Sequence, residues 1–143
     1  MSAAAADSGA RTIQRVLAAD PAVRLAYLFG SQARGAAGPR SDWDVAVLVD
    51  PSALKRRWPG AEIELADALA DALGSPVDVV LLNTAPPVLA HEVLRDGDVL
   101  VEREPGERTR FEMAAMRRYL DTRPLRQIRD RAVSERLSRP EGT

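Results

Sequence analysis

The chain has 143 residues, 45% of them hydrophobic and 29% charged. No uncharged apolar run reaches the roughly 20 residues needed to cross a bilayer, and the first residues do not resemble a secretion signal, so we expect one soluble, cytoplasmic domain without a membrane partner. The absence of cysteine and the single histidine exclude disulfides, thiol nucleophiles, cysteine-ligated zinc and a histidine charge relay, so any metal site must use carboxylates, which favours Mg²⁺ or Mn²⁺. The formal net charge of −1 provides no general attraction for nucleic acid, and we expect no direct nucleic-acid binding.

Helices and strands are predicted to alternate along the chain, after a disordered terminus over residues 1–8. Strands are short apolar runs that end at turn residues, and helices show apolar residues every three or four positions. In chain order, the pattern predicts a helix over 8–19, a strand over 23–29, a short helix over 31–36, a strand over 42–49, a helix over 61–73, a strand over 76–82, a helix over 86–97, a strand over 98–102, and helices over 104–121 and 124–137. The alternation predicts an α/β or α+β sheet covered by helices, with residues 104–139 as a helical tail.

Two acidic residues open the predicted second strand. Asp42 and Asp44 are two positions apart, so a strand directs both carboxylates to one face and Trp43 to the other. Like charges placed this way repel each other. A pair of divalent metal ions that clamps the oxygens of a phosphoryl displacement would compensate the repulsion.

Gly30 and Ser31 follow the first predicted strand and begin a helix. The glycine allows backbone to approach a ligand closely, and unpaired N–H groups at a helix start bind phosphate. Arg34 and Arg40 lie between this turn and the acidic pair, where their guanidinium groups either contact the same phosphates or are solvated. We therefore expect one nucleotide-phosphate site built from both strand ends.

A third acid, Asp78, lies within the otherwise apolar strand 76–82. A carboxylate in a buried strand is costly unless it is paired or bound to metal. If this strand lies beside strand 42–49, Asp78 joins the acidic pair and holds the metal that activates an attacking hydroxyl. The alternative is an edge strand in which Asp78 faces water.

Charge is distributed unevenly along the chain. Residues 1–102 carry nine basic and 14 acidic side chains, a net charge of −5, whereas residues 103–143 carry 11 basic and seven acidic side chains, a net charge of +4. Phe111, Ala115 and Tyr119 are spaced four apart and form a helical stripe, which packs either inward or against a partner. The basic tail is therefore interpreted either as a protein-docking element or as a set of solvated helix faces.

Gly30-Ser31, ten further residues, Asp42-x-Asp44 and an acid on a later strand together resemble the signature of the DNA polymerase beta-like nucleotidyltransferase superfamily. The small size is similar to that of the minimal nucleotidyltransferases (MNT), and the run from Arg117 to Leu125 resembles the MNT antitoxins that pair with HEPN ribonuclease toxins. The resemblance implies a small mixed sheet covered by helices. It also implies an enzyme that transfers AMP from ATP to a tyrosine of a HEPN toxin encoded nearby, as part of a hetero-oligomer.

Residue by residue, the resemblance implies that Gly30 and Ser31 hold nucleotide phosphates, that Asp42 and Asp44 bind Mg²⁺, and that Asp78 is the third ligand and the general base. Two alternatives remain open: transfer of a nucleotide to a small molecule such as an aminoglycoside, and a non-catalytic subunit that only occludes its partner. The remaining conspicuous residues are interpreted as structural: Tyr27, Trp43, Trp58, His91 and Tyr119.

Overall fold

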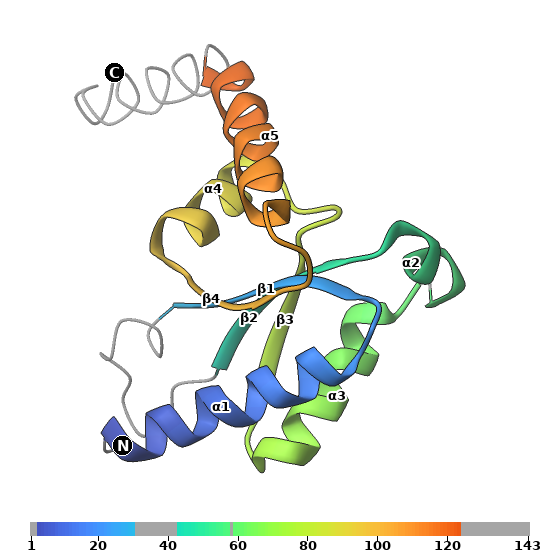
Figure 1. Cartoon of the computed structure of the whole chain (residues 1–143), viewed down its shortest axis with the longest axis vertical. Coiled ribbons are helices and arrows are strands. Elements are labelled where there is room, and N and C mark those ends of the chain that lie inside the picture. Colours follow the sequence, from blue (N-terminus) through green and yellow to red (C-terminus); the bar gives the residue numbers. More distant parts are fainter. Residues whose placement is uncertain (1–2, 31–42, 58, 124–143) are drawn as a thin grey trace, which may run out of the picture.

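The computed structural model describes residues 3–30, 43–57 and 59–123, which form one sheet flanked by helices (Figure 1). The elements are α1 (Ala3–Ala19), β1 (Val23–Phe29), β2 (Trp43–Val49), α2 (Pro51–Arg57), α3 (Ala61–Leu73), β3 (Val77–Leu81), α4 (Pro87–Asp96), β4 (Asp98–Glu102) and α5 (Glu107–Asp121). None of the helices in these ranges is long and apolar enough to cross a membrane.

The sheet is small and mixed, as the resemblance to the nucleotidyltransferases implies. Its strand order is β3-β2-β1-β4, with β1 antiparallel to both β2 and β4, and β2 parallel to β3. Because β1 runs opposite to β2 and β3, its carboxyl end meets the amino ends of those two strands at the same edge of the sheet. The chain segments that carry Gly30, Asp44 and Asp78 therefore converge there.

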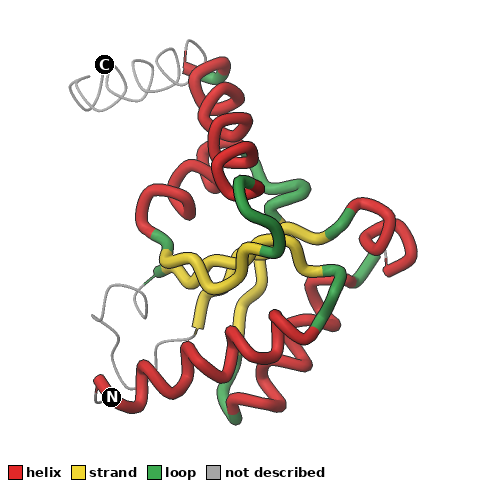
Figure 2. Tube along the Cα trace, in the orientation of Figure 1, coloured by secondary structure: helices red, strands yellow, loops and turns green. Residues whose placement is uncertain are grey.

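Helices cover both faces of the sheet, α1 and α3 on one side and α4 and α5 on the other (Figure 2). Helices α1 and α3 pack on one face of the sheet through Ile13, Leu17 and Leu69. On the opposite face, Val93 of α4 packs in the same cluster as Tyr27. All five side chains are at most 1% exposed. The alternation of strand side chains between two apolar layers explains why the central strands are nearly continuous in hydrophobic residues.

The structure differs from the predicted elements at two places. Helix α1 begins at Ala3, not at Ser8, so the disordered terminus expected over residues 1–8 is wrong from residue 3 onward; its run of alanines has the highest helix propensity of any residue type. Helix α2 was not predicted, because Asp50-Pro51 was interpreted only as the end of a strand. The predicted helices over 31–36 and 124–137 lie outside the described residues.

Arg103 ties the segment before α5 to the turn between α1 and β1. Its guanidinium donates hydrogen bonds to the carbonyl oxygens of Ala18, Asp20 and Val23, at 3.1, 2.9 and 3.1 Å. Hydrogen bonds from a charged donor are stronger than those between neutral groups. This one side chain therefore holds together elements that are about 80 residues apart in the sequence.

We predict that Arg103→Ala lowers the free energy of unfolding by about 2 kcal/mol, because three carbonyl groups lose a charged donor. The matched control is Arg95→Ala, which removes an exposed ion pair with the adjacent Asp96 and is expected to cost no more than about 0.5 kcal/mol. Urea denaturation followed by circular dichroism measures both. Equal losses in the two variants would show that Arg103 does not stabilise this junction.

Candidate active site

The acids of β2 and β3 lie side by side. Asp44 is the register partner of Asp78 across the parallel strand pair, and of Phe29 across the antiparallel pair with β1. Neighbouring strands are about 4.8 Å apart, and register partners direct their side chains to the same face. The structure therefore confirms that strand 77–81 lies beside strand 43–49 and brings Asp78 next to Asp44.

Trp43 and Asp44 point to opposite faces of the sheet, as the two-residue period of a strand predicts. Trp43 is only 3% exposed and belongs to the apolar cluster under α1 and α3, where it lies directly against the backbone of Gly9. Asp44 shares the other face with Ala46, which packs in the cluster under α4. The buried indole thus fixes the orientation of the strand that presents the carboxylate.

Gly30 presses its backbone against the carboxylate of Asp44. Its φ is +79°, a left-handed conformation that side chains rarely adopt. A Cβ atom at this position would lie 2.5 Å from Oδ2 of Asp44 and 3.2 Å from Cγ. Glycine therefore fits between the end of β1 and the acid of β2, where a larger residue would collide with the carboxylate. The predicted close approach of this backbone to a ligand stays a prediction.

Asp78 lies beside Asp44, as predicted, but its side chain is exposed and not buried. The sequence predicts a carboxylate within a buried strand, whereas β3 is an edge strand of the sheet and Asp78 is exposed. The alternative of an edge strand with Asp78 in contact with water is therefore correct, and its desolvation cost is small. What remains unusual is its register opposite another carboxylate, since like charges directly opposite one another destabilise a strand pair.

The other predicted site residues, Ser31, Arg34, Arg40 and Asp42, lie outside the described residues. The segment that holds them connects Gly30 to Trp43, and both of these flanking residues lie at the edge that carries Asp44. In the ranges that the structure covers, no three histidine or acidic side chains gather closely enough to hold a metal ion. Asp44 and Asp78 supply two hard oxygen ligands of the kind that Mg²⁺ and Mn²⁺ prefer, so the residues present fit such an ion.

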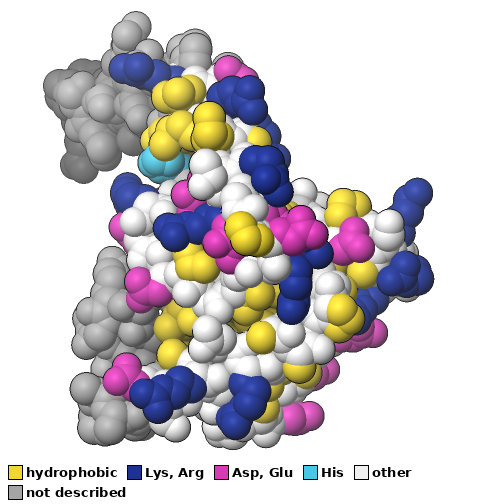
Figure 3. Space-filling model, in the orientation of Figure 1, with side chains coloured by type: hydrophobic (Ala, Val, Ile, Leu, Met, Phe, Trp, Pro, Cys, Tyr) yellow, Lys and Arg dark blue, Asp and Glu magenta, His cyan; other side chains and the backbone are white. Residues whose placement is uncertain are grey.

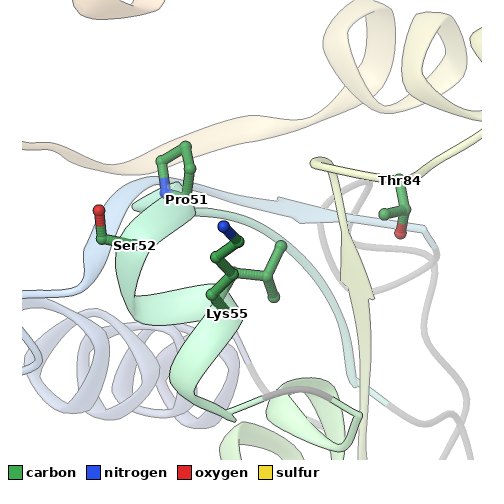
Figure 4. Close-up of a pocket in the computed structure, with 5 residues that line it drawn as sticks. Pro51, Ser52, Lys55 and Thr84 are labelled. Atoms are coloured by element: carbon green, nitrogen blue, oxygen red, sulfur yellow. The ribbon is translucent and has the colours of Figure 1, made fainter.

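A cavity of about 610 Å³ lies at the opposite end of β2 (Figure 4). It is lined by Pro51, Ser52, Leu54, Lys55 and Thr84, which follow the carboxyl ends of β2 and β3. The acids occupy the amino ends of the same strands. The cavity is therefore not part of the acidic site.

The aromatic residues and the histidine of the described segments have structural roles, as predicted. Tyr27 is fully buried, and its hydroxyl donates a hydrogen bond to Glu112 Oε1 at 3.0 Å; burial and this bond raise the pKa of Tyr27. The rings of His91 and Tyr119 stack with centroids 3.8 Å apart. These contacts join β1 to α5 and α4 to α5. Trp58 lies outside the described residues.

Residues 11–106, more than half of the chain, match the family described as Polymerase beta, Nucleotidyltransferase. The protein adenylyltransferase MntA of Aphanizomenon flos-aquae (strain 2012/KM1/D3) is 36% identical over 99 residues, which make up 65% of this chain and 65% of that protein. The chain thus spans slightly less than two thirds of the length of this curated relative.

Two solved structures of complexes are similar over nearly the whole of their matching chains. The crystal structure of a toxin–antitoxin complex with AMP-PNP has a TM-score of 0.73 and 32% identity, covering 87% of this chain and 98% of that one. The structure of a tri-AMPylated Shewanella oneidensis HEPN toxin in complex with an MNT antitoxin has a TM-score of 0.68 and 29% identity, covering 90% and 98%.

The contact between Gly30 and Asp44 predicts an energetic coupling. Gly30→Ala forces a side chain into a left-handed backbone, at about 1 kcal/mol, and collides with the Asp44 carboxylate, at about a further 1–3 kcal/mol. Gly74→Ala is the matched control, because Gly74 has a φ of +72° and nothing within 4 Å of its added Cβ. Urea denaturation is expected to show the larger loss for Gly30→Ala.

A double-variant cycle tests the cause of that difference. In a chain that already carries Asp44→Ala, Gly30→Ala should cost no more than Gly74→Ala, because the colliding carboxylate is absent. An unchanged cost in that background would mean that Gly30 does not abut the acid.

Proposed function

We propose that this chain, which belongs to the polymerase beta nucleotidyltransferase family, is a minimal nucleotidyltransferase antitoxin. It transfers AMP from Mg-ATP to a tyrosine hydroxyl of a HEPN-type toxin and so acts as the antitoxin of that toxin. The observation that carries the proposal is the register of Asp44 with Asp78, next to the close approach of Gly30 to the Asp44 carboxylate. A relative named protein adenylyltransferase and a similar complex that contains an AMPylated HEPN toxin support the choice of AMP as the transferred group. Because the reaction consumes ATP, we place it in the cytoplasm.

The nucleotide would occupy the space in front of Gly30. The backbone of Gly30 and Ser31 would hold its phosphates, and Arg34 and Arg40 would supply positive charge to them. A similar structure contains AMP-PNP, which supports an ATP-like substrate.

The acids would bind the metal. Asp42, Asp44 and Asp78 would hold Mg²⁺, which neutralises charge on the phosphates and stabilises the displacement when it is bound. Such an ion would also relieve the repulsion between Asp44 and Asp78, which the register places opposite one another. The same pair of carboxylates would accept Mn²⁺.

The transfer is a direct displacement at the α-phosphorus of ATP. The tyrosine oxygen forms a bond to this phosphorus while the bond to the bridging oxygen of the β-phosphate breaks, and pyrophosphate leaves. Asp78 takes the proton of the tyrosine hydroxyl, which is general-base catalysis. The remaining residues position the reactants and neutralise charge, and the reaction needs no covalent intermediate on this chain.

The position of Asp78 favours a large acceptor. Since β3 is an edge strand and Asp78 is exposed, no further strand within residues 3–30, 43–57 and 59–123 covers the proposed base. A side chain on the surface of another protein can therefore reach it. This accessibility, together with the HEPN complexes among the similar structures, is the reason for choosing a protein hydroxyl as the acceptor.

We predict that Asp44→Asn reduces AMP transfer to the HEPN toxin encoded beside this chain by at least about 100-fold, because a metal ligand is lost. Asp78→Asn should lower turnover by at least about 100-fold, with a smaller effect on the affinity for AMP-PNP, because a base acts in the transition state. Transfer is measured with α-³²P-labelled ATP, and nucleotide affinity by calorimetry. Asp71→Asn, which changes an exposed acid on α3, is the matched control and should leave both unchanged.

Full transfer by Asp44→Asn with unchanged dependence on Mg²⁺ would refute the metal assignment. Loss of nucleotide affinity with unchanged turnover in Asp78→Asn would make Asp78 a binding residue. A wild-type chain that binds the toxin and Mg-ATP without transferring AMP would identify a non-catalytic neutralising subunit instead of an enzyme.

A further inference from the structure

Helix α5 carries an exposed apolar stripe. Met113, Met116 and Leu120 are 62%, 44% and 49% exposed and are spaced three and four residues apart, so they share one face of the helix. The space-filling view shows hydrophobic side chains gathered over α5, next to the histidine (Figure 3). Large apolar side chains clustered in this way on a surface indicate an interaction site.

The inward face of α5 is occupied by a different stripe. Ala115 is buried, Phe111 packs against the cluster under α4, and Tyr119 stacks on His91. The stripe of Phe111, Ala115 and Tyr119 therefore packs inward, which is one of the two alternatives predicted from the sequence. The exposed stripe is additional, and the packing of α5 onto the sheet does not explain it.

Ion pairs and hydrogen bonds hold α5 in a fixed orientation. Arg24 of β1 donates to both carboxylate oxygens of Glu107, at 2.9 and 3.0 Å. Glu112 accepts hydrogen bonds from the Tyr27 hydroxyl at 3.0 Å and from Arg108 Nε at 2.8 Å. The stripe is thus presented on an immobilised helix, and a partner would not have to order it on binding.

A small cavity adjoins the stripe. It has a volume of about 230 Å³ and is lined by His91, Leu94, Arg95, Glu112 and Met116. Met116 belongs to both the cavity and the stripe. An apolar side chain projecting from a partner could enter this cavity, in the manner of the anchor residues that dominate protein interfaces.

The exposed arginines around the stripe favour a partner with acidic residues. Arg110, Arg117 and Arg118 are exposed on α5, together with one exposed acid, Asp121, at the end of the helix. The other two acids of α5, Glu107 and Glu112, are already paired with Arg24, Tyr27 and Arg108. In a symmetric dimer the same surface patch faces its own copy, which would bring these arginines together. Residues 124–143 carry five basic and three acidic side chains, so this segment is also basic. Neither a second copy of this chain nor residues 124–143 would therefore complement the exposed arginines of α5.

We propose that the stripe of Met113, Met116 and Leu120 is the surface on which the protein acceptor docks, and that the acceptor contributes an amphipathic helix with acidic residues flanking its apolar face. This proposal rests on the proposed function, since the acceptor is the HEPN-type toxin that receives AMP. Apolar contacts would supply affinity, and the flanking arginines would supply orientation and a faster association.

The test compares the double variant Met113→Glu/Met116→Glu with Ile63→Glu. Glutamate maintains helix propensity, and Ile63 on α3 is 61% exposed, which matches Met113. Binding of the HEPN toxin encoded beside this chain is measured by calorimetry, together with binding of Mg-AMP-PNP and the mass of the free chain in solution. We expect the double variant to bind the toxin about 100-fold more weakly, with nucleotide affinity unchanged, and Ile63→Glu to bind like the wild type.

A second variant, Arg117→Glu/Arg118→Glu, tests the charge. It should slow association with the toxin and weaken its dependence on salt. If the first double variant does not fold, Leu120→Glu replaces it and is expected to weaken binding in the same direction.

The outcomes separate the two proposals. If the wild type transfers AMP to the toxin and the stripe variants bind the toxin normally, the docking surface is wrong and the proposed function stands. If the wild type is a dimer that the stripe variants convert to monomers without loss of toxin binding, the occupant is a second copy and the docking proposal is overturned. If the wild type neither binds nor modifies the toxin, both proposals fail.

Discussion

The alignment of Asp44 with Asp78 is the constraint on which the rest of the site depends. Two carboxylates in register on adjacent strands repel each other, and the interior of a sheet offers many less costly pairs. Gly30, held at a φ of +79°, lies so close to Asp44 that a side chain at this position would collide with the carboxylate. On the proposed function, a bound cation with the phosphates of its nucleotide would relieve the repulsion between the two acids.

The proposed catalytic site and the proposed docking surface lie on different parts of the fold. The acids lie at the edge where β1 ends and β2 and β3 begin, because β1 runs in the opposite direction to β2 and β3. Trp43, buried on the opposite face, anchors the strand that carries Asp44. Helix α5 is fixed to β1 through Arg24 and Tyr27, and it presents a second, apolar surface outward. On our two proposals, a small chain would bind a large acceptor without building a deep pocket for it.

The sequence predicted strand 23–29 with its observed limits, because a short apolar run before Gly30 has few other interpretations. It also predicted the opposite orientations of Trp43 and Asp44, which follow from the period of a strand. It misjudged the burial of Asp78, since a strand's own residues do not reveal whether another strand lies beside it. The exposed stripe of α5 was missed for a related reason: two apolar stripes on one helix differ only by what packs against them. Ser31, Arg34, Arg40 and Asp42 remain predictions.

The most direct measurement is a crystal structure of the full chain with Mn²⁺ and AMP-PNP, in which anomalous scattering locates the metal. The account predicts a manganese peak between the carboxylates of Asp44 and Asp78, with the phosphates of the nucleotide in front of Gly30. Nucleotide bound in the cavity near Lys55 and Thr84, or a metal that contacts neither acid, would contradict it.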